Sequence, residues 1–250
     1  MNGAASGVRV WLFDGGTFDV PAGLMEAGGG ERRLRIPTVW AAVSHPQGLG
    51  MIDSGPTAPA SSGSVCQPFS MEAALATMGA GPGQVRWLIN THLHVDHVGA
   101  NRRLRNATVL VQESELAYAH APTDACMVAE YDSGLLRPGR SVSEVLDGDL
   151  DLFGDGSVVI LASPGHSPGH QSVLLRLDSG NHMLIAGDAV WTERCRSRDV
   201  LPGLLWSPQA YRASRERLLA LADRHACRWV HAHEPGTFAE GGWPQAEAIG

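Results

Sequence analysis

Short runs of apolar residues, or of alternating apolar and polar residues, recur along the chain between turn-forming residues. A period of two is typical of β-strands, and short apolar runs that end at Gly, Pro, Asn or Asp also favour strands over helices. The pattern predicts strands at residues 8–13, 36–44, 49–52, 85–90, 108–112, 149–152, 157–162, 171–177, 182–186 and 228–232.

Four other stretches carry helix signals. Ser70 suits the N-cap of a helix over residues 70–78, and Glu72 in its first turn complements the helix dipole. Further helices are expected over residues 99–105, 113–120 and 208–225. Strands followed by a helix occur in each half of the chain, an order that suits two packed sheets with helices outside. We expect an α+β fold in which residues 1–250 form one domain.

Two long stretches lack a clear period. Residues 17–35 are rich in glycine and are predicted to form a mobile loop, and residues 121–146 are predicted to form a second one. In the second stretch the apolar side chains line a substrate pocket or simply pack the loop against the core; these side chains are Met127, Tyr131, Leu135 and Leu136.

Composition is that of an ordinary soluble protein, with 44% hydrophobic and 18% charged residues in a chain of 250. No apolar run is long enough for a membrane span, and the first seven residues lack the pattern of a signal peptide. We therefore expect a cytoplasmic protein with no membrane partner. Cys66, Cys126, Cys195 and Cys227 form no C-x-x-C pair, so free thiols are expected.

The charge distribution argues against a nucleic-acid partner. The formal net charge is −7, and nucleic-acid enzymes need a basic track for phosphates. Arg102, Arg103 and Arg105 form the one dense basic cluster near the candidate site, and we interpret them as a solvated helix face. The chain contains no Lys, which excludes Schiff-base chemistry.

The strongest chemical signal directly follows the strand predicted at residues 85–90. His92, His94, Asp96 and His97 stand there within six residues. In an extended segment the first two rings project from the same side, whereas the adjacent Asp96 and His97 diverge and can reach a second ion. Imidazole and carboxylate ligands together suit zinc or a similar divalent metal.

Further candidate ligands follow three later strands. The segment that begins at Ser163 reads S-P-G-H-S-P-G-H and contains His166 and His170. Asp188 follows the strand predicted at residues 182–186, and the last strand ends in H-A-H-E, with His231 and His233. Because every group follows a strand, the sequence predicts that they meet at one edge of the fold.

These motifs resemble the metallo-β-lactamase superfamily over nearly the whole chain. The H-x-H-x-D-H signature is followed, in the same order, by a P-G-H-x-P-G-H block, a G-D-A element and a terminal H-[DE]. The resemblance implies an αββα sandwich, in which two mixed sheets are flanked by helices, with a dinuclear metal site at one edge. Zinc is the first expectation for both ions, with iron, cobalt and manganese as alternatives.

The resemblance also implies a ligand set. His92, His94 and His170 would hold the first metal, whereas Asp96, His97 and His233 would hold the second, with Asp188 bridging both. On this reading His166 orients the ligands or stabilises the turn, and His231 is not a ligand. Four isolated histidines are interpreted as surface or structural residues: His45, His120, His182 and His225.

Two metals side by side would acidify a water and polarise a carbonyl, with Asp96 or Asp188 moving the proton. The R-I-P-T-V-W segment at residues 35–40 and the P-G-H block are similar to those of N-acyl homoserine lactonases, and L-F-D-G-G at residues 12–16 to that of pyridoxolactonases. Lactone hydrolysis of a small molecule is therefore expected. In the lactonases a Tyr three residues after the bridging Asp polarises the lactone carbonyl; here that position is Trp191, whose indole can donate a hydrogen bond but no proton.

Other interpretations stay open at this point. The same site would serve a pyridoxolactone-like lactone, an ester, a glyoxalase II-like thioester or a phosphotriester. A metal-binding module without catalysis is the alternative of a different class, and it usually lacks ligands that are all present here. The resembling lactonases are commonly homodimers, so a homodimer is a further expectation, with residues 17–35 at the interface.

Overall fold

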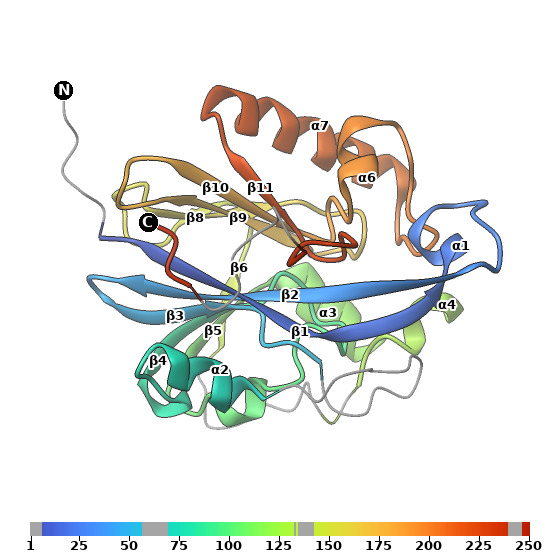
Figure 1. Cartoon of the computed structure of the whole chain (residues 1–250). Coiled ribbons are helices and arrows are strands. Elements are labelled where there is room, and N and C mark those ends of the chain that lie inside the picture. Colours follow the sequence, from blue (N-terminus) through green and yellow to red (C-terminus); the bar gives the residue numbers. More distant parts are fainter. Residues whose placement is uncertain (1–6, 57–69, 133, 135–142, 240–246) are drawn as a thin grey trace.

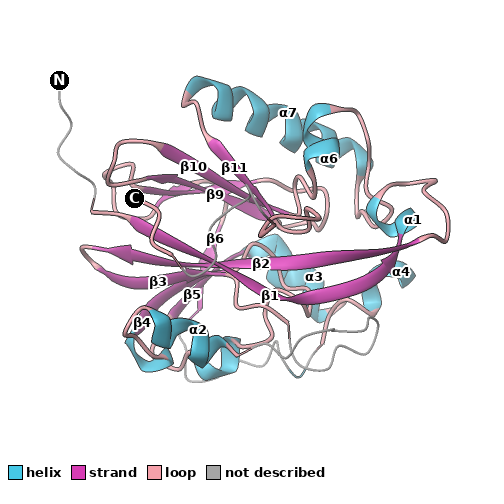
Figure 2. Cartoon of the chain, viewed as in Figure 1, coloured by secondary structure: helices cyan, strands magenta, loops and turns pink. Residues whose placement is uncertain are grey.

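The computed structural model describes residues 7–56, 70–132, 134, 143–239 and 247–250. Two β-sheets face each other, and helices cover the outer side of each sheet (Figures 1 and 2). The αββα arrangement expected from the sequence is therefore confirmed. The apolar residues Leu135 and Leu136 lie outside the described residues.

The first sheet has six strands in the order β1-β2-β3-β4-β5-β6. Its first three strands are antiparallel, whereas β3 to β6 run parallel to one another. The strands are β1 (Arg9–Pro21), β2 (Arg33–His45), β3 (Gly48–Ile52), β4 (Val85–Ile89), β5 (Thr108–Gln112) and β6 (Ser143–Leu146).

The second sheet has five strands in the order β11-β10-β9-β8-β7. It is antiparallel except at β10 and β11, which are parallel and so end at the same edge. The strands are β7 (Leu150–Asp151), β8 (Val158–Ala162), β9 (Gln171–Arg176), β10 (His182–Gly187) and β11 (Arg228–His231).

Two of the helices begin directly after a serine that caps them. The side chains of Ser70 and Ser207 accept hydrogen bonds from the backbone N–H groups of Ala73 and Ala210, as expected for these residues at helix starts. The α-helices are α1 (Ala22–Met25), α2 (Met71–Thr77), α3 (Glu113–His120), α4 (Ala125–Val128), α6 (Glu193–Ser197) and α7 (Pro208–Arg224), and the 3-10 helices are η1 (Pro82–Gln84) and η2 (Asn101–Arg103).

Alternation along the strands builds the layer between the sheets. In β2, Val39, Ala41 and Val43 belong to the cluster between the sheets, whereas Trp40 and Ala42 belong to the outer cluster beneath α2. Both faces of the strand are buried, so the run reads as continuously apolar.

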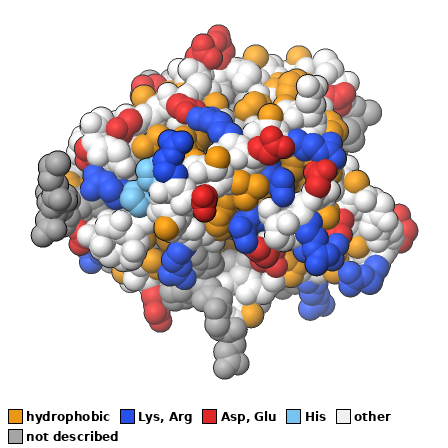
Figure 3. Space-filling model, turned by 90° about the horizontal axis from the view of Figure 1, so that it is seen from above, with side chains coloured by type: hydrophobic (Ala, Val, Ile, Leu, Met, Phe, Trp, Pro, Cys, Tyr) orange, Lys and Arg blue, Asp and Glu red, His pale blue; other side chains and the backbone are white. Residues whose placement is uncertain are grey.

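The outer faces of the sheets are covered by helices. Helix α2 buries Met71 and Leu75 against the first sheet, and α7 buries Leu218 and Ala222 against the second. On the face that α7 occupies, Arg and acidic side chains are interspersed rather than gathered into one basic track (Figure 3). None of the described helices is long and apolar enough to cross a membrane.

The glycine-rich stretch at residues 17–35 differs from its prediction. Its ends extend β1 and β2, which pair from Arg9↔Ser44 to Pro21↔Arg33 with a register shift between Asp14 and Thr17. The turn itself is confined to α1 and the glycines that follow it. Cross-strand pairing therefore overrides the local effect of glycine, and the expected homodimer through this stretch stays a prediction.

Other elements also differ from the sequence prediction. The helix expected at residues 99–105 is the short η2, and α4, β6 and α6 lie where no helix or strand was expected. Met127, expected in a pocket wall or in the loop packing, is fully buried in the cluster beneath α7. The described cysteines with placed side chains, Cys195 and Cys227, are free thiols, as expected.

Leu12 tests the layer between the sheets, because its side chain is fully buried there. We expect Leu12→Ala to lower the free energy of unfolding by about 2–5 kcal/mol, since it leaves a cavity in a close-packed core. Urea denaturation followed by circular dichroism measures this change. Val128→Ala, at an exposed position, is the control and should change it by about 0.5 kcal/mol or less. Equal effects of the two substitutions would contradict the assigned core.

Candidate metal centre

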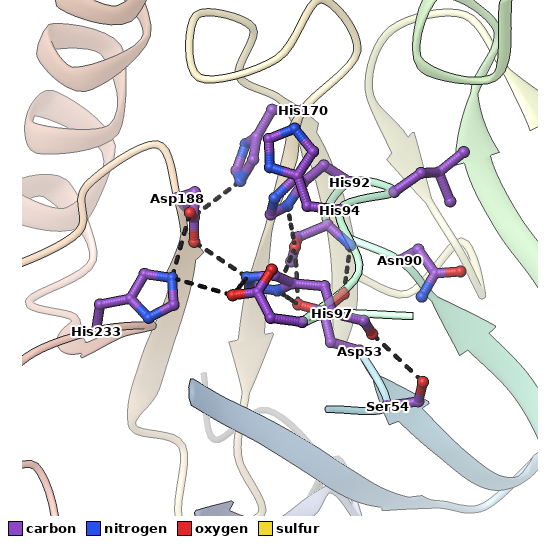
Figure 4. A network of polar contacts seen from close by, with 12 residues as sticks. Asp53, Ser54, Asn90, His92, His94, His97, His170, Asp188 and His233 are labelled. Carbon is purple, nitrogen blue, oxygen red and sulfur yellow. Dashed lines mark hydrogen bonds and ion pairs between the residues drawn. The ribbon is translucent and has the colours of Figure 1, made fainter. Parts of the chain in front are cut away.

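The expected ligands lie beyond the ends of strands at one edge of the sandwich. His92, His94, Asp96 and His97 follow β4, Asp188 directly follows β10, and His233 lies just beyond β11. Figure 4 shows the labelled histidines and Asp188 converging from these separate segments. The sequence prediction that strand ends bring these residues together is therefore confirmed by their positions.

Three overlapping groups of side chains bring nitrogen or carboxylate atoms within 4.8 Å of one another. All but one of their members are buried, and Asp96 is half-buried. The groups are His92, His94 and His166; His92, His97 and Asp188; and Asp96, His97 and His233. Because the middle group shares a histidine with each of the others, the array is long enough for two adjacent metal sites.

Asp188 lies at the centre of this array. Its Oδ2 is 3.3 Å from Nε2 of His166 and 3.3 Å from Nε2 of His233, and its Oδ1 is 3.4 Å from Nε2 of His97. The Oδ2 of Asp96 lies 3.5 Å from His97 and 3.7 Å from His233. A carboxylate that faces both ends of the array is suited to bridge two cations.

Four of the histidines are oriented through the outer ring nitrogen, Nδ1. In each case the partner of Nδ1 is an oxygen, so Nδ1–H donates to it and Nε2 faces the other members of the array. These pairs are His92 with Thr91 Oγ1 at 3.1 Å, His97 with Asp53 Oδ2 at 2.7 Å, His166 with the Leu204 carbonyl at 3.2 Å and His233 with the Pro37 carbonyl at 2.8 Å.

The inward atoms fit a divalent metal pair. Tetrahedral zinc with bonds of about 2.0–2.2 Å separates neighbouring ligand atoms by about 3.4 Å, and the facing atoms here are 3.3–3.7 Å apart. Buried polar atoms without a hydrogen bond are rare because each costs roughly 1–3 kcal/mol. Within the described residues such atoms include Nε2 of His92 and His97 and Oδ1 of Asp188.

Charge is distributed unevenly over the array. Burial raises the pKa of Asp188, but His233 and the neighbouring histidines hold it well below its usual range. Burial lowers the pKa of His97 and His233, and the carboxylates that face them reverse this and raise both. Burial, reinforced by nearby histidines, lowers the pKa of His92 and His94 well below the usual value, which favours the neutral form of both rings.

Asp53, which the sequence does not identify as a site residue, fixes the ring of His97. Its Oδ1 accepts from the Thr91 backbone N–H at 2.7 Å, and its Oδ2 accepts from Thr91 Oγ1 and from His97 Nδ1, each at 2.7 Å. The φ angle of Asp53 is +57°, a left-handed conformation that costs a non-glycine residue roughly 1–2 kcal/mol. A carboxylate behind a metal-binding histidine orients its ring and makes it a stronger ligand.

His166, rather than His170, joins His92 and His94, which differs from the sequence prediction. Nε2 of His170 accepts from the Asp188 backbone N–H and its Nδ1 contacts Ser163 Oγ, each at 2.9 Å. Nε2 of His166 lies instead 3.0 Å from Nδ1 of His94. His170 therefore contacts the Asp188 backbone, whereas His166 is the histidine of this block that clusters with His92 and His94.

His231 belongs to none of the three groups. Its Nδ1 bonds the Val190 carbonyl at 2.9 Å, and its Nε2 lies 3.6 Å from Glu193. It lines an open hollow of about 1120 Å³ between α7 and β11 that contains none of the ligand residues. This hollow is therefore not part of the candidate metal centre.

A smaller pocket opens directly onto the candidate ligands. It has a volume of about 250 Å³ and includes His94, Asp96, His166, Asp188 and His233 in its floor. Apolar side chains form most of the remaining wall: Phe18, Val20, Pro21, Leu24, Ile36, Val95, Trp191 and Leu204. The pocket therefore joins a polar, metal-binding end to an apolar end.

Trp191 lies between the two metal-binding groups. Its ring centroid is 5.4 Å from that of His166 and 5.1 Å from that of His233. The side chain is buried, and its Nε1–H makes no hydrogen bond to the described part of the chain. Trp191 therefore lines the pocket and carries a buried donor that the described part of the chain leaves unpaired.

Comparison with known proteins identifies the family. The chain matches the metallo-beta-lactamase superfamily over residues 34–227. It belongs to this superfamily. Among the curated members, the N-acyl homoserine lactonase AttM of Azorhizobium caulinodans is 32% identical over 220 residues, which cover 81% of this chain and 84% of that protein.

Solved structures of the superfamily share the fold of this chain. An N-acyl homoserine lactone hydrolase with N-hexanoyl-L-homoserine bound at its catalytic metal centre superimposes with a TM-score of 0.85 at 20% identity, covering 96% of this chain and 98% of that one. AidC, a dizinc quorum-quenching lactonase, superimposes with a TM-score of 0.74 at 14% identity, covering 95% of this chain and 88% of that one.

Matched substitutions distinguish His166 from His170 as the ligand. We expect His166→Asn to bind roughly one equivalent of zinc rather than two, because it removes an inward nitrogen from the first site. His170→Asn keeps an acceptor for the Asp188 backbone and should still bind two. Metal analysis after zinc reconstitution and gel filtration measures both. Loss of a metal from His170→Asn alone would return the ligand role to His170.

Proposed function

We propose that this superfamily member is a dinuclear metal hydrolase that opens the ring of N-acyl homoserine lactones. The observation that carries the proposal is the pair of adjoining ligand groups, with Asp188 between them, at the floor of a largely apolar pocket. The curated relative AttM, 32% identical to this chain, is named for this activity.

The pocket matches the two-part chemistry of such a substrate. A lactone ring carries a polar ester, which belongs beside the metal ligands, and the acyl tail is apolar. Phe18, Val20, Leu24 and Ile36 provide an apolar wall for the tail. Burial of that tail would contribute roughly 25 cal/mol for each Å² of apolar surface removed from water.

The proposal also includes a place for each metal ion. Two divalent ions, with zinc expected first and iron, cobalt or manganese as alternatives, would lower the pKa of a water toward about 7 and polarise the ester carbonyl. We propose that the first is held by His92, His94 and His166 and the second by Asp96, His97 and His233, with Asp188 bridging them.

Hydrolysis joins the oxygen of water to the carbonyl carbon and breaks the ring C–O bond. One proton of the water passes to the leaving alkoxide, and the new carboxylic acid releases the other at neutral pH. Asp96 is suited to carry the first proton because its carboxylate is 19% exposed and lines the pocket, whereas Asp188 is almost fully buried. We assign Trp191 to the carbonyl oxygen, which would accept a hydrogen bond from the unpaired Nε1–H.

Proton release tests the proposed reaction. With N-hexanoyl homoserine lactone and enzyme of known metal content, we expect one proton per turnover near neutral pH, measured with a pH indicator. A chelator should abolish the release and added zinc should restore it, and a series of acyl lengths would report the depth of the apolar wall. Absence of release from an enzyme that holds two metals would remove this substrate class, and other lactones, esters, thioesters and phosphotriesters would then be assayed.

Trp191→Phe tests the assignment of the indole. Phenylalanine keeps a ring between His166 and His233 but cannot donate a hydrogen bond. We expect kcat to fall about tenfold with little change in KM, the pattern of a hydrogen bond that matters mainly in the transition state. Steady-state kinetics at equal metal content measures both constants. An unchanged kcat would mean that Trp191 only packs in the pocket wall and donates no hydrogen bond in the transition state.

A further inference from the structure

Glu115 is a buried carboxylate that lies next to the metal centre without belonging to any of its ligand groups. It stands in helix α3, with its side chain withdrawn from solvent. Burying a carboxylate is expensive unless hydrogen bonds compensate for the lost water. The partners of Glu115 therefore indicate what the side chain is for.

Each carboxylate oxygen of Glu115 accepts from one backbone N–H and one hydroxyl. Oε1 accepts from the Leu93 N–H and from Tyr131 Oη, each at 3.0 Å. Oε2 accepts from Ser167 Oγ at 2.6 Å and from the Gly169 N–H at 3.0 Å. All four partners donate, so the site is built for a group that only accepts.

These partners belong to segments that hold metal ligands. Leu93 stands between His92 and His94, and Ser167 directly follows His166. The ring centroids of His94 and His166 are 4.7 Å apart. Glu115 thus ties together the two loops whose separation determines whether these two rings can share an ion.

The backbone around Glu115 is closely packed against the loop that contains Gly169. A Cβ at Gly169 would lie 2.2 Å from the backbone nitrogen of Glu115, so the second loop packs directly on helix α3. Tyr131 adds a third link, because its ring lies 4.7 Å from that of His94 while its hydroxyl binds Glu115. The next residue back, Glu130, lines the substrate pocket.

We propose that Glu115 is a positioning residue that holds the His92–His94 and His166–Gly169 segments at the separation required by the first metal site. It touches neither substrate nor metal. The inference rests on the proposed dinuclear centre, but it concerns metal affinity and does not depend on the identity of the substrate.

Glu115→Gln is the direct test. The amide keeps the size of the side chain but places an NH₂ group against a backbone N–H, either that of Leu93 or that of Gly169, and neither can accept. We expect the first site to bind metal about 10–100-fold more weakly, as for other groups that orient metal ligands. The second site, whose support comes from Asp53 and the Pro37 carbonyl, should keep its affinity within about threefold.

Titration of the apo protein with cobalt, in competition with a chelator, measures the metal affinity of each site. The visible spectrum of the bound cobalt shows which of the two sites is filled. His166→Asn provides the reference spectrum for a damaged first site, and His233→Asn that for a damaged second site. Glu113→Gln makes the same chemical change at an exposed position of the same helix and is the matched control. Thermal unfolding of each apo variant shows whether the fold is retained.

Tyr131→Phe tests the hydrogen bond from Tyr131 to Glu115 separately from the bonds that Glu115 makes to the two ligand loops. It removes one of the four hydrogen bonds and leaves both loop contacts, so metal affinity should stay within about threefold of the wild type while KM rises. If Glu115→Gln fails to fold, Ser167→Ala takes its place and should weaken the first site selectively by a smaller factor.

Equal weakening of both sites, or a first site unchanged in Glu115→Gln, would overturn the proposal. Failure of the proposed function gives a different result. In that case the wild type binds two metals without hydrolysing the lactone, and the comparison of metal affinities among the variants retains its meaning.

Discussion

The facing carboxylates and histidines around Asp188 are the constraint on which the rest of the structure depends. Their inward atoms lie 3.3–3.7 Å apart, too far for strong hydrogen bonds and close to the spacing of ligands around one cation. Such a buried array is costly without a cation, because charged groups there are poorly solvated. The fold must therefore hold these side chains in place against their own tendency to rearrange.

The two sheets provide that rigidity. Strands β4, β10 and β11 deliver His92, Asp188 and His233 to the same edge, and the layer between the sheets fixes the strands relative to one another. Outside the ligands stands a ring of oxygen acceptors, from Asp53 and Thr91 to backbone carbonyls, which orients the imidazoles. Ligands on stiff strand ends and orienting partners behind them are the two requirements of a precise metal site.

Most of the architecture is readable from the sequence because period-two patterns and strand-end motifs are local signals. The clustering of His92, His94, Asp96, His97, Asp188 and His233 follows from strand ends and family motifs alone. The long pairing of β1 with β2 is not readable in this way, since it depends on partners far apart in sequence that override the local effect of glycine.

The choice between His166 and His170 shows where sequence reasoning stops. Both stand in identical S-P-G-H contexts four residues apart, so local pattern cannot distinguish them. The path of the loop across helix α3 distinguishes the two histidines. It turns His166 toward His94 and His170 toward the Asp188 backbone. Asp53 and Glu115 were missed for a similar reason: each supports ligands through contacts that exist only once separate segments have come together.

Anomalous diffraction from crystals grown with zinc would test the dinuclear centre most directly. The account predicts two peaks at the zinc edge, one among His92, His94 and His166 and the other among Asp96, His97 and His233, with Asp188 in contact with both. A single peak, or a first peak coordinated by His170 while His166 faces away, would contradict it.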